Sequence, residues 1–316
     1  MPPHPGPDAG TGVLQCLRSY EVAYFHGAHN VMLSLIYDPA CAEYAHSYHP
    51  ETPARVLATA KSLQTRWPDV SVQRPGLASE VDLLRAHRPG HLARLLTPPD
   101  FDGDTPWSPG IGDHARRAAG GALLASREAL RGKQAFSLLR PPGHHATADR
   151  AMGFCYLNSV AIAALAALVQ GCTRVGIWDF DAHHGNGTEA IVQGHSAIRF
   201  ASVHQYPGYP GTGTRSAGNA HNWPVPPRTD RGKHAAAVRA ALDVLLAFKP
   251  DLLLVSAGFD AFVHDPITDM SLELEDFYSF GTWLGQSGVP AAAILEGGYS
   301  GELGTLVQAF LEGWEG

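Results

Sequence analysis

The sequence predicts an α/β fold: a single three-layer αβα domain with a mostly parallel central sheet. Short apolar segments alternate along the chain with longer amphipathic segments, which is the pattern of βαβ units. The chain has 316 residues and no internal repeat, and this length suits one large α/β domain better than two small ones. We therefore expect one domain over residues 32–316, with polar loops at the ends of its strands.

The first 31 residues do not fit this pattern. Residues 1–12 are rich in Pro and Gly, and residues 14–30 show no clean helical or strand period. The first convincing strand begins after Met32. We expect residues 1–31 to be a disordered or non-core extension.

The expected strands are short apolar runs bounded by turn residues. They cover residues 33–37, 135–139, 174–178, 198–203, 252–256 and 291–295. Apolar residues at helical spacing predict helices at 53–65, from 79 onward, and at 113–132, 159–169, 187–193, 233–248 and 273–285. Pro53 suits a first helical turn and Ser79 suits an N-cap. The Pro-, Asp- and Gly-rich segment 97–112 is expected to be a functional loop.

Composition excludes several classes of protein. Hydrophobic residues make up 45% of the chain and charged residues 17%, which is enough apolar surface for a sizeable core. The net charge of −7 and the absence of a Lys/Arg run argue against direct nucleic-acid binding. No apolar run reaches membrane-spanning length, and no secretory signal is visible. The four cysteines form no C-x-x-C pair, so we expect reduced thiols and a cytoplasmic protein.

One motif dominates the sequence: Asp179, Asp181 and His183 follow directly on the strand expected at 174–178. A strand has a side-chain period of two, so these alternate residues are expected on one side of the backbone. Carboxylate oxygen and imidazole nitrogen are ligands of zinc-type sites. The alternative interpretation is a polar strand end with capping aspartates, and the motif by itself supports both equally.

Further polar groups follow other expected strands. Ligands of open α/β sheets bind outside the carboxyl ends of the strands, and four chemically distinct motifs fall there. They are His144–His145, Asp181–His183, Asp260 and Tyr299. By itself Asp260 would more simply be a turn former or a helix cap. With Asp181 and His183 it completes three protein ligands, which leaves coordination positions open, as in catalytic zinc sites.

The two adjacent histidines and the tyrosine have both a structural and a catalytic interpretation. His144 and His145 could be surface polar residues, or a base for water activation beside a second imidazole. A catalytic imidazole needs an orienting acceptor, for which Asp179 and Asn186 are candidates. Tyr299 could be a strand-end aromatic, or could direct its hydroxyl at a substrate carbonyl.

These segments resemble the zinc-dependent histone deacetylase family, which has the arginase–deacetylase fold. The resemblance covers the chain from about residue 33 to its end, with the motifs at 49–55, 140–146, 153–158, 179–188, 210–213, 256–260 and 295–299. Asn186 and the Leu295–Glu296 pair resemble the class II and bacterial branch, which includes histone deacetylase-like amidohydrolases and acetylpolyamine amidohydrolases. Residues 32–316 are thereby expected to be a deacetylase-like catalytic domain.

The resemblance implies a role for each matching residue. One Zn²⁺ per chain would bind Asp181, His183 and Asp260, although iron(II) could take the same ligands. His145 would be general base and then acid, with His144 as its electrostatic partner. Asp179 would orient His144, Asn186 would orient His145, and Tyr299 would stabilise the oxyanion. The walls of a narrow substrate tunnel would be Gly153, Phe154 and Tyr209, with Ile267 at its rim. A potassium ion would bind near Asp179, Asp181, His183, Ser202 and Val203, largely through backbone carbonyls.

The expected activity is removal of an acetyl or longer acyl group from acyl-lysine in proteins or peptides. The loop after Tyr209 and the apolar Ile267 favour this substrate. The alternative is acetylpolyamine deacetylation, because residues 265–267 and 287–290 resemble acetylpolyamine amidohydrolases. Acidic residues of the 97–112 loop could contact a distal ammonium, although a solvated loop is the simpler interpretation: Asp100, Asp102 and Asp104.

Two other functions are less well supported. A catalytically silent acyl-lysine-binding protein would lack a metal ligand or Tyr299. This chain has all three expected ligands and the tyrosine. The arginase branch of the fold places bridging aspartates where this chain has Gly185 and Phe262, neither of which can ligate a metal through its side chain. One metal ion and amide hydrolysis are therefore expected. The sequence does not indicate an oligomeric state.

Overall fold

The structure is a computed structural model that describes residues 33–316. The extension expected at residues 1–31 lies outside the described residues. Within them, no helix is both long and apolar enough to cross a membrane.

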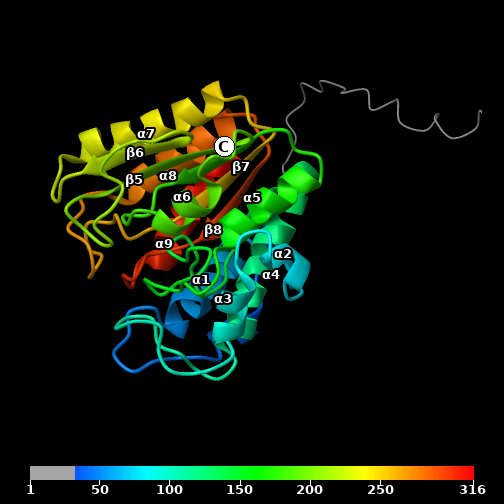
Figure 1. Cartoon of the computed structure of the whole chain (residues 1–316). Coiled ribbons are helices and arrows are strands. Elements are labelled where there is room, and N and C mark those ends of the chain that lie inside the picture. Colours follow the sequence, from blue (N-terminus) through cyan, green and yellow to red (C-terminus); the bar gives the residue numbers. More distant parts are fainter. Residues whose placement is uncertain (1–32) are drawn as a thin grey trace, which may run out of the picture. The chain divides into compact units, whose positions relative to one another are not determined.

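An eight-stranded sheet forms the centre of the described chain, and every pair of neighbouring strands is parallel. Figure 1 shows the strands, which are β1 (Leu33–Ile36), β2 (Ser71–Gln73), β3 (Gln134–Ser137), β4 (Val175–Asp179), β5 (Ile198–Gln205), β6 (Ala220–Val225), β7 (Leu252–Ala257) and β8 (Ala291–Leu295). Their order across the sheet is β2-β1-β3-β8-β7-β4-β5-β6. The last two strands in the sequence, β7 and β8, therefore lie between β3 and β4 in the sheet.

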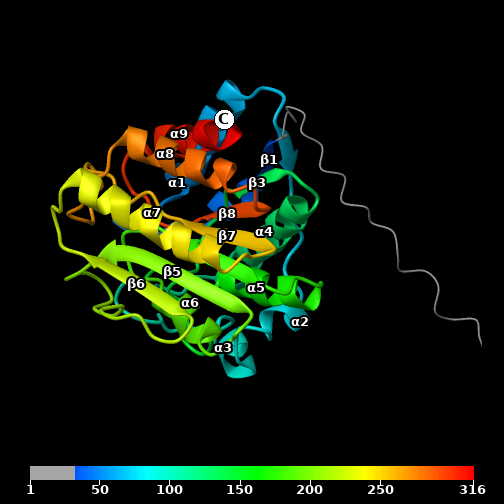
Figure 2. The ribbon, with the colours of Figure 1, turned by 90° about the horizontal axis from the view of Figure 1, so that it is seen from above.

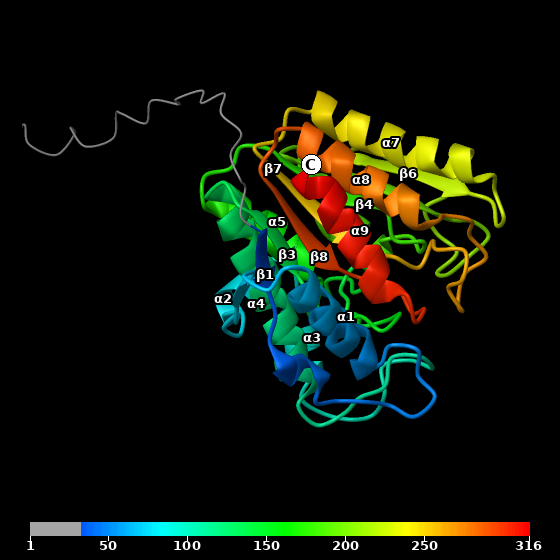
Figure 3. The same ribbon diagram turned by 180° about the vertical axis from the view of Figure 1, so that it is seen from behind.

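Helices cover both faces of this sheet, as the three-layer prediction requires (Figure 2). One layer contains α1 (Pro53–Arg66), α7 (Arg231–Ala247), α8 (Leu274–Gln286) and α9 (Leu303–Glu315), which lie side by side in Figure 3. The other contains α4 (Ile111–Leu130), α5 (Ser159–Val169) and α6 (Asn186–Val192). Two short helices, α2 (Glu80–Leu83) and α3 (Pro89–Arg94), and a 3₁₀ turn (Pro39–Ala42) lie in the loops.

An aromatic cluster lies directly beneath the loops that follow β4 and β7. Phe180 contacts Trp178, Phe259, Phe280 and Phe310, with ring centroids 5.1, 6.0, 5.4 and 5.7 Å away. All five side chains are fully buried. Edge-to-face and tilted aromatic pairs of this kind add about 0.5–1.5 kcal/mol each beyond the burial of their surface. Phe180 and Phe259 precede Asp181 and Asp260 by one residue, so this packing fixes the backbone from which those carboxylates leave.

The structure contains elements that the sequence analysis did not predict: β2, β6, α3 and α9. Strand β6 contains Pro224, which is tolerated because β6 is at the edge of the sheet. Helix α9 buries Leu303, Leu306, Val307 and Phe310 at helical spacing. The helix expected from Ser79 is only one turn long, although Ser79 caps it as predicted by accepting a bond from the Asp82 N–H.

The fold buries an imidazole that has no hydrogen-bond partner among residues 33–316. This is His234, in the first turn of α7, whose side chain is fully buried and whose two ring nitrogens contact no donor or acceptor of that part of the chain. Burial lowers the pKa of His234 to about 4. The pKa of this imidazole is therefore lower in the folded chain than its value of about 6.5 in the unfolded chain. As the pH falls from 6.5 toward 4, the unfolded chain binds a proton that the folded chain does not bind, and the free energy of unfolding decreases.

We predict that His234→Leu makes unfolding less sensitive to acid. Between pH 7 and pH 5 the wild type should lose up to about 2 kcal/mol of unfolding free energy through this group, and the variant should not. Urea unfolding at both pH values measures the difference. The exposed His195→Leu is the control, and a variant with the same pH dependence as the wild type would contradict the prediction.

Candidate active site

The strand order places the predicted site residues on four adjacent strands. His144 and His145 follow β3, Tyr299 follows β8, Asp260 follows β7, and Asp181 and His183 follow β4. These are the neighbours β3-β8-β7-β4 in the middle of the sheet. The carboxyl ends of parallel strands form one edge, so the groups converge there.

Three metal-competent side chains form the centre of this edge. His183 Nδ1 lies 2.9 Å from Asp260 Oδ2 and 3.2 Å from Asp181 Oδ1. A tetrahedral ion with ligands at about 2.1 Å holds its ligand atoms roughly 3–3.5 Å apart, which matches this spacing. Both carboxylates are fully buried and His183 is half-buried. The three residues therefore have the donor atoms and the separation of a zinc-type site.

The remaining oxygens of the two carboxylates are held by backbone N–H groups. Gly297 donates to Asp181 Oδ2 at 2.7 Å, and Ala182 donates to Asp260 Oδ1 at 2.8 Å. This close approach requires glycine. A Cβ on Gly258 would lie 2.1 Å from Asp181 Oδ2, and one on Gly297 would lie 2.2 Å from Asp260 Oδ2. The glycines of the 256–260 and 295–299 motifs thus leave room for the carboxylates.

The electrostatics of these residues favour a bound cation. Burial alone would lower the pKa of His183, but the carboxylates of Asp260 and Asp181 outweigh it and raise the pKa well above its usual value. Burial and the Asp181 charge also raise the pKa of Asp260. Without a metal, these pKa shifts favour a bound proton among His183, Asp181 and Asp260, which offsets part of their negative charge. A divalent ion would take over that role, so the residues present fit the metal that the sequence predicts.

The structure changes one detail of the sequence interpretation. Strand β4 ends at Asp179, so the alternation expected through Asp181 and His183 does not continue as strand. The Asp179 carboxylate accepts a bond from the Asp181 N–H at 3.2 Å and turns to His144 instead of the three metal-competent side chains. Within residues 33–316, just one other group of three possible ligands exists, formed by His144, Cys155 and Glu296.

His144 and Asp179 form a buried charged pair. His144 Nδ1 donates to Asp179 Oδ2 at 3.1 Å, and its Nε2 lies 3.7 Å from Asp181 Oδ1. Burial lowers the pKa of His144, but the charges of Asp181 and Asp179 outweigh it and raise the pKa to about 10. The two carboxylates therefore favour the protonated, positively charged form of His144.

His145 is held differently, by a neutral amide. Its Nδ1 donates to Asn186 Oδ1 at 2.8 Å, which leaves the lone pair on Nε2. Burial, followed by the positive charges of His144 and His183, holds the pKa of His145 well below its usual value. The imidazole is therefore neutral, which is the state that a general base needs. The two predicted orienting contacts, Asp179 to His144 and Asn186 to His145, are both present.

Tyr299 follows β8 and packs against Phe154 and Arg55. Its ring is 5.7 Å from the Phe154 ring, and the Arg55 guanidinium lies 4.6 Å over its face. Burial raises the pKa of its hydroxyl well above the usual value, against the opposing charge of Arg55. The hydroxyl therefore stays protonated and can donate a hydrogen bond.

Two of the residues expected to line the tunnel, Gly153 and Tyr209, lie against the imidazole of His145. The Tyr209 ring is 5.0 Å from it, and a Cβ on Gly153 would lie 2.5 Å from His145 Cδ2 and 2.8 Å from Tyr209 Cε1. Gly153 and Phe154 have φ of 56° and 67°, and the second of these is unusual for a side chain of that size. Ile267, the residue expected at the tunnel rim, is 37% exposed in the loop after β7.

The residues expected near a potassium ion lie at the ends of β4 and β5. Asp179 pairs with Ser202 in the sheet register, and Val203 follows Ser202 in β5. Ser202 Oγ is already engaged with His204 Nδ1 at 2.9 Å. Ligation there would therefore have to come largely from backbone carbonyls, as the resemblance implies.

Three functional contacts were not predicted from the sequence. Arg55 donates from Nε to the Gly298 carbonyl at 2.7 Å, and Asp265 Oδ2 accepts from the Tyr299 N–H at 2.7 Å. Glu296 Oε2 accepts from the N–H groups of Gly143 and His144 at 2.6 and 3.1 Å. Each contact joins segments that are far apart in the chain, so no local spacing could have indicated it.

The acidic loop lies near the tunnel wall. His49 Nε2 donates to the Asp104 carbonyl oxygen at 3.0 Å, and the His49 ring is 4.5 Å from Phe154. Burial, followed by the charge of Asp104, raises the pKa of the Tyr209 hydroxyl, and Asp102 adds to the shift. The 97–112 loop therefore lies close enough to Tyr209, an expected wall residue, for its carboxylates to act on that side chain.

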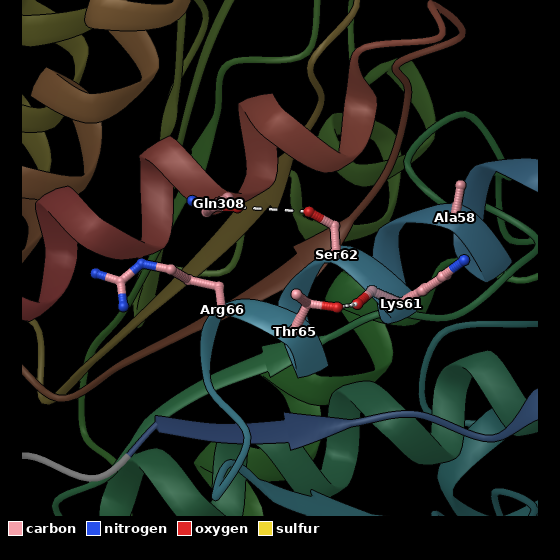
Figure 4. Close-up of a pocket in the computed structure, with 6 residues that line it drawn as sticks. All are labelled: Ala58, Lys61, Ser62, Thr65, Arg66 and Gln308. Atoms are coloured by element: carbon pink, nitrogen blue, oxygen red, sulfur yellow. Dashed lines mark hydrogen bonds between the residues drawn. The ribbon is translucent and has the colours of Figure 1, made fainter.

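A separate hollow lies between α1 and α9 and is shown in Figure 4. It is lined by Ala58, Lys61, Ser62, Thr65, Arg66 and Gln308. Its side chains bond to one another, as in the Ser62–Gln308 contact of 3.4 Å, and Arg66 pairs with Glu312 at 2.6 Å. The hollow contains none of the predicted site residues.

Comparisons with known proteins agree with this geometry. A histone deacetylase domain matches residues 49–313. The chain is 38% identical over 299 residues to a probable deacetylase of Methanothermobacter thermautotrophicus, covering 89% of this chain and 90% of that protein. It is 36% identical over 245 residues to acetylpolyamine amidohydrolase 2 of Pseudomonas aeruginosa, covering 74% and 71%.

A solved structure supports the same relationship. The crystal structure of acetylpolyamine aminohydrolase from Burkholderia pseudomallei superposes with a TM-score of 0.82 at 27% identity, covering 90% of this chain and 98% of that one. The family resemblance and the fold predicted from the sequence are thereby confirmed. This chain is an amidohydrolase that belongs to the histone deacetylase family.

Proposed function

We propose that the protein hydrolyses the amide bond of an acetylated amine, with one Zn²⁺ held by Asp181, His183 and Asp260. The observation that carries this proposal is the neutral His145, oriented by Asn186, beside those three ligands. When bound, the ion would supply Lewis-acid chemistry at the acyl carbonyl and lower the pKa of a water molecule. A potassium ion near Asp179 and Ser202 is a secondary part of the proposal.

The chain's own residues would move the protons. His145 Nε2 would accept a proton from the attacking water and return it to the nitrogen of the departing amine, so that the imidazole ends neutral. The Tyr299 hydroxyl would donate to the carbonyl oxygen as negative charge develops there. His144, positively charged and paired with Asp179, would stabilise the same negative charge through space.

For the substrate we propose an acetylated polyamine, which was the alternative in the sequence analysis. Relatives named acetylpolyamine amidohydrolase support it, at 36% identity to one and 37% to another protein of Pseudomonas aeruginosa. The chain itself supports it through the acidic loop, because the Phe154 N–H donates to the Thr105 hydroxyl oxygen at 3.1 Å and so holds the neighbouring Asp104 close to the proposed tunnel. Asp104 and Asp102 are also among the charges that raise the pKa of the Tyr209 hydroxyl. A carboxylate near the tunnel would attract the free ammonium of a polyamine whose acetylated end lies inside.

Acyl-lysine in a peptide is the second candidate. Tyr206, Tyr209 and Ile267, in the loops after β5 and β7, are each 37% exposed and apolar. An apolar rim suits the uncharged backbone around an acyl-lysine better than a second ammonium group.

We predict one zinc per chain in the wild type. Asp260→Ala should reduce metal content to below about a tenth of that, because one of three protein ligands is lost. Elemental analysis of purified protein measures this, with the exposed Asp269→Ala as control. Two ions per chain would contradict our interpretation of Gly185 and Phe262.

Tyr299→Phe should keep the metal and lose activity. Removing one oxyanion donor typically lowers kcat about 100- to 1,000-fold. We expect that loss on acetylputrescine, with zinc content unchanged. Turnover equal to the wild type would remove Tyr299 from the mechanism.

The substrate proposal predicts that kcat/KM for acetylputrescine exceeds kcat/KM for an acetyl-lysine peptide by about tenfold or more. A tenfold ratio corresponds to a free-energy difference of about 1.4 kcal/mol, which is the scale of a single charge contact. Asp102→Asn with Asp104→Asn should narrow this ratio, and the exposed Asp113→Asn, outside the loop, is the control. A preference for the peptide would make acyl-lysine the substrate class.

A further inference from the structure

Asp265 is a buried carboxylate that the proposed chemistry does not use. It lies in the loop after β7 and is 6% exposed. Burial, followed by the charge of Asp260, raises its pKa to about 7. A buried acid is costly unless its oxygens are well satisfied, so its partners indicate why the position holds one.

Each oxygen of Asp265 accepts one backbone N–H. Oδ1 accepts from Ile267 at 3.1 Å, and Oδ2 accepts from Tyr299 at 2.7 Å. The first bond spans two residues and is an ordinary turn contact, which any Asp–Pro turn could make. The second joins residues 34 apart and ends on the residue that carries the proposed oxyanion donor. A turn former has no need of the second bond.

Arg55 and Asp265 hold the two ends of one peptide group. Arg55 Nε donates to the Gly298 carbonyl oxygen at 2.7 Å, and Asp265 accepts from the Tyr299 N–H. This carbonyl and this N–H belong to the same planar unit, so the two bonds fix its orientation. Gly298, with φ of 113°, would otherwise leave that unit free to rotate.

The orientation of this peptide decides where the Tyr299 side chain leaves the backbone. Arg55 also lies over the face of the ring at 4.6 Å, but that contact still allows the ring to slide along the guanidinium plane. Asp265 is the only described group that holds the Tyr299 N–H through a side chain. The same carboxylate reaches Ile267, so the tunnel rim and the tyrosine share one anchor.

We propose that Asp265 is a positioning residue for the reaction: its carboxylate fixes the Gly298–Tyr299 peptide so that the tyrosine hydroxyl faces the acyl carbonyl. This inference rests on the proposed role of Tyr299. It assigns Asp265 no contact with the substrate and no share in proton transfer. Because a 1 Å misplacement of a catalytic group can cost about 100-fold in rate, loss of this anchor should be visible in kcat.

The test is a double-mutant cycle on the metal-loaded, full-length enzyme with acetylputrescine and an acetyl-lysine peptide. The variants are Asp265→Ala, Tyr299→Phe and the pair, with Asp269→Ala, exposed on the same loop, as the matched control. We expect Asp265→Ala to lower kcat about 10- to 100-fold with zinc content unchanged, and Asp269→Ala to stay within about twofold of wild type. In the Tyr299→Phe background, Asp265→Ala should change kcat by less than about twofold, because the hydroxyl that it positions is already gone.

The outcomes separate this inference from the proposed function. If Tyr299→Phe is as active as the wild type, the role of the tyrosine fails first. If Tyr299→Phe is impaired but the two losses multiply, Asp265 acts by another route and the inference is overturned. Asp265→Asn keeps one acceptor oxygen and should recover part of the lost kcat. It replaces Asp265→Ala in the cycle if the alanine variant does not fold, with the same expected coupling.

Discussion

The structure depends on the concentration of negative charge at the carboxyl ends of two adjacent parallel strands, β4 and β7. Asp179, Asp181 and Asp260 are fully buried there. Burying a carboxylate without compensation is strongly unfavourable, so each one needs a hydrogen-bond donor or a positive partner. Backbone N–H groups, the imidazoles of His144 and His183, and the proposed metal ion provide this compensation. The surrounding fold brings the carboxylates and these compensating groups together at one edge of the sheet.

Packing beneath the site makes this arrangement rigid. Phe180 and Phe259 lie in the aromatic cluster, and each precedes a proposed metal ligand by one residue. Gly258 and Gly297 leave space at the same point, since a Cβ on either would overlap a carboxylate. The aromatic side chains and the two glycines together restrict the positions of the proposed ligands, as a metal site needs.

The two adjacent histidines show how neighbouring groups of the same type acquire different charge states. His144 faces two carboxylates, which raise its pKa to about 10. His145 faces an amide oxygen, and burial together with the charge of His144 holds its pKa well below the usual value. The surroundings therefore favour the protonated form of one imidazole and the neutral form of its neighbour. This division follows from Asp179 and Asn186, which the chain supplies at the start and the end of one short segment.

The sequence by itself determined the α/β class, six of the eight strands, the three metal-competent residues and the family, because these depend on local period and on motifs of fixed spacing. It missed β6, whose proline is tolerated only at a sheet edge, and it extended the strand period past Asp179, where β4 ends. Only the tertiary structure decided that β8 and β7 enter between β3 and β4, which makes the four site loops neighbours. It also decided the contacts of Arg55, Asp265 and Glu296, since each joins segments that no sequence spacing relates.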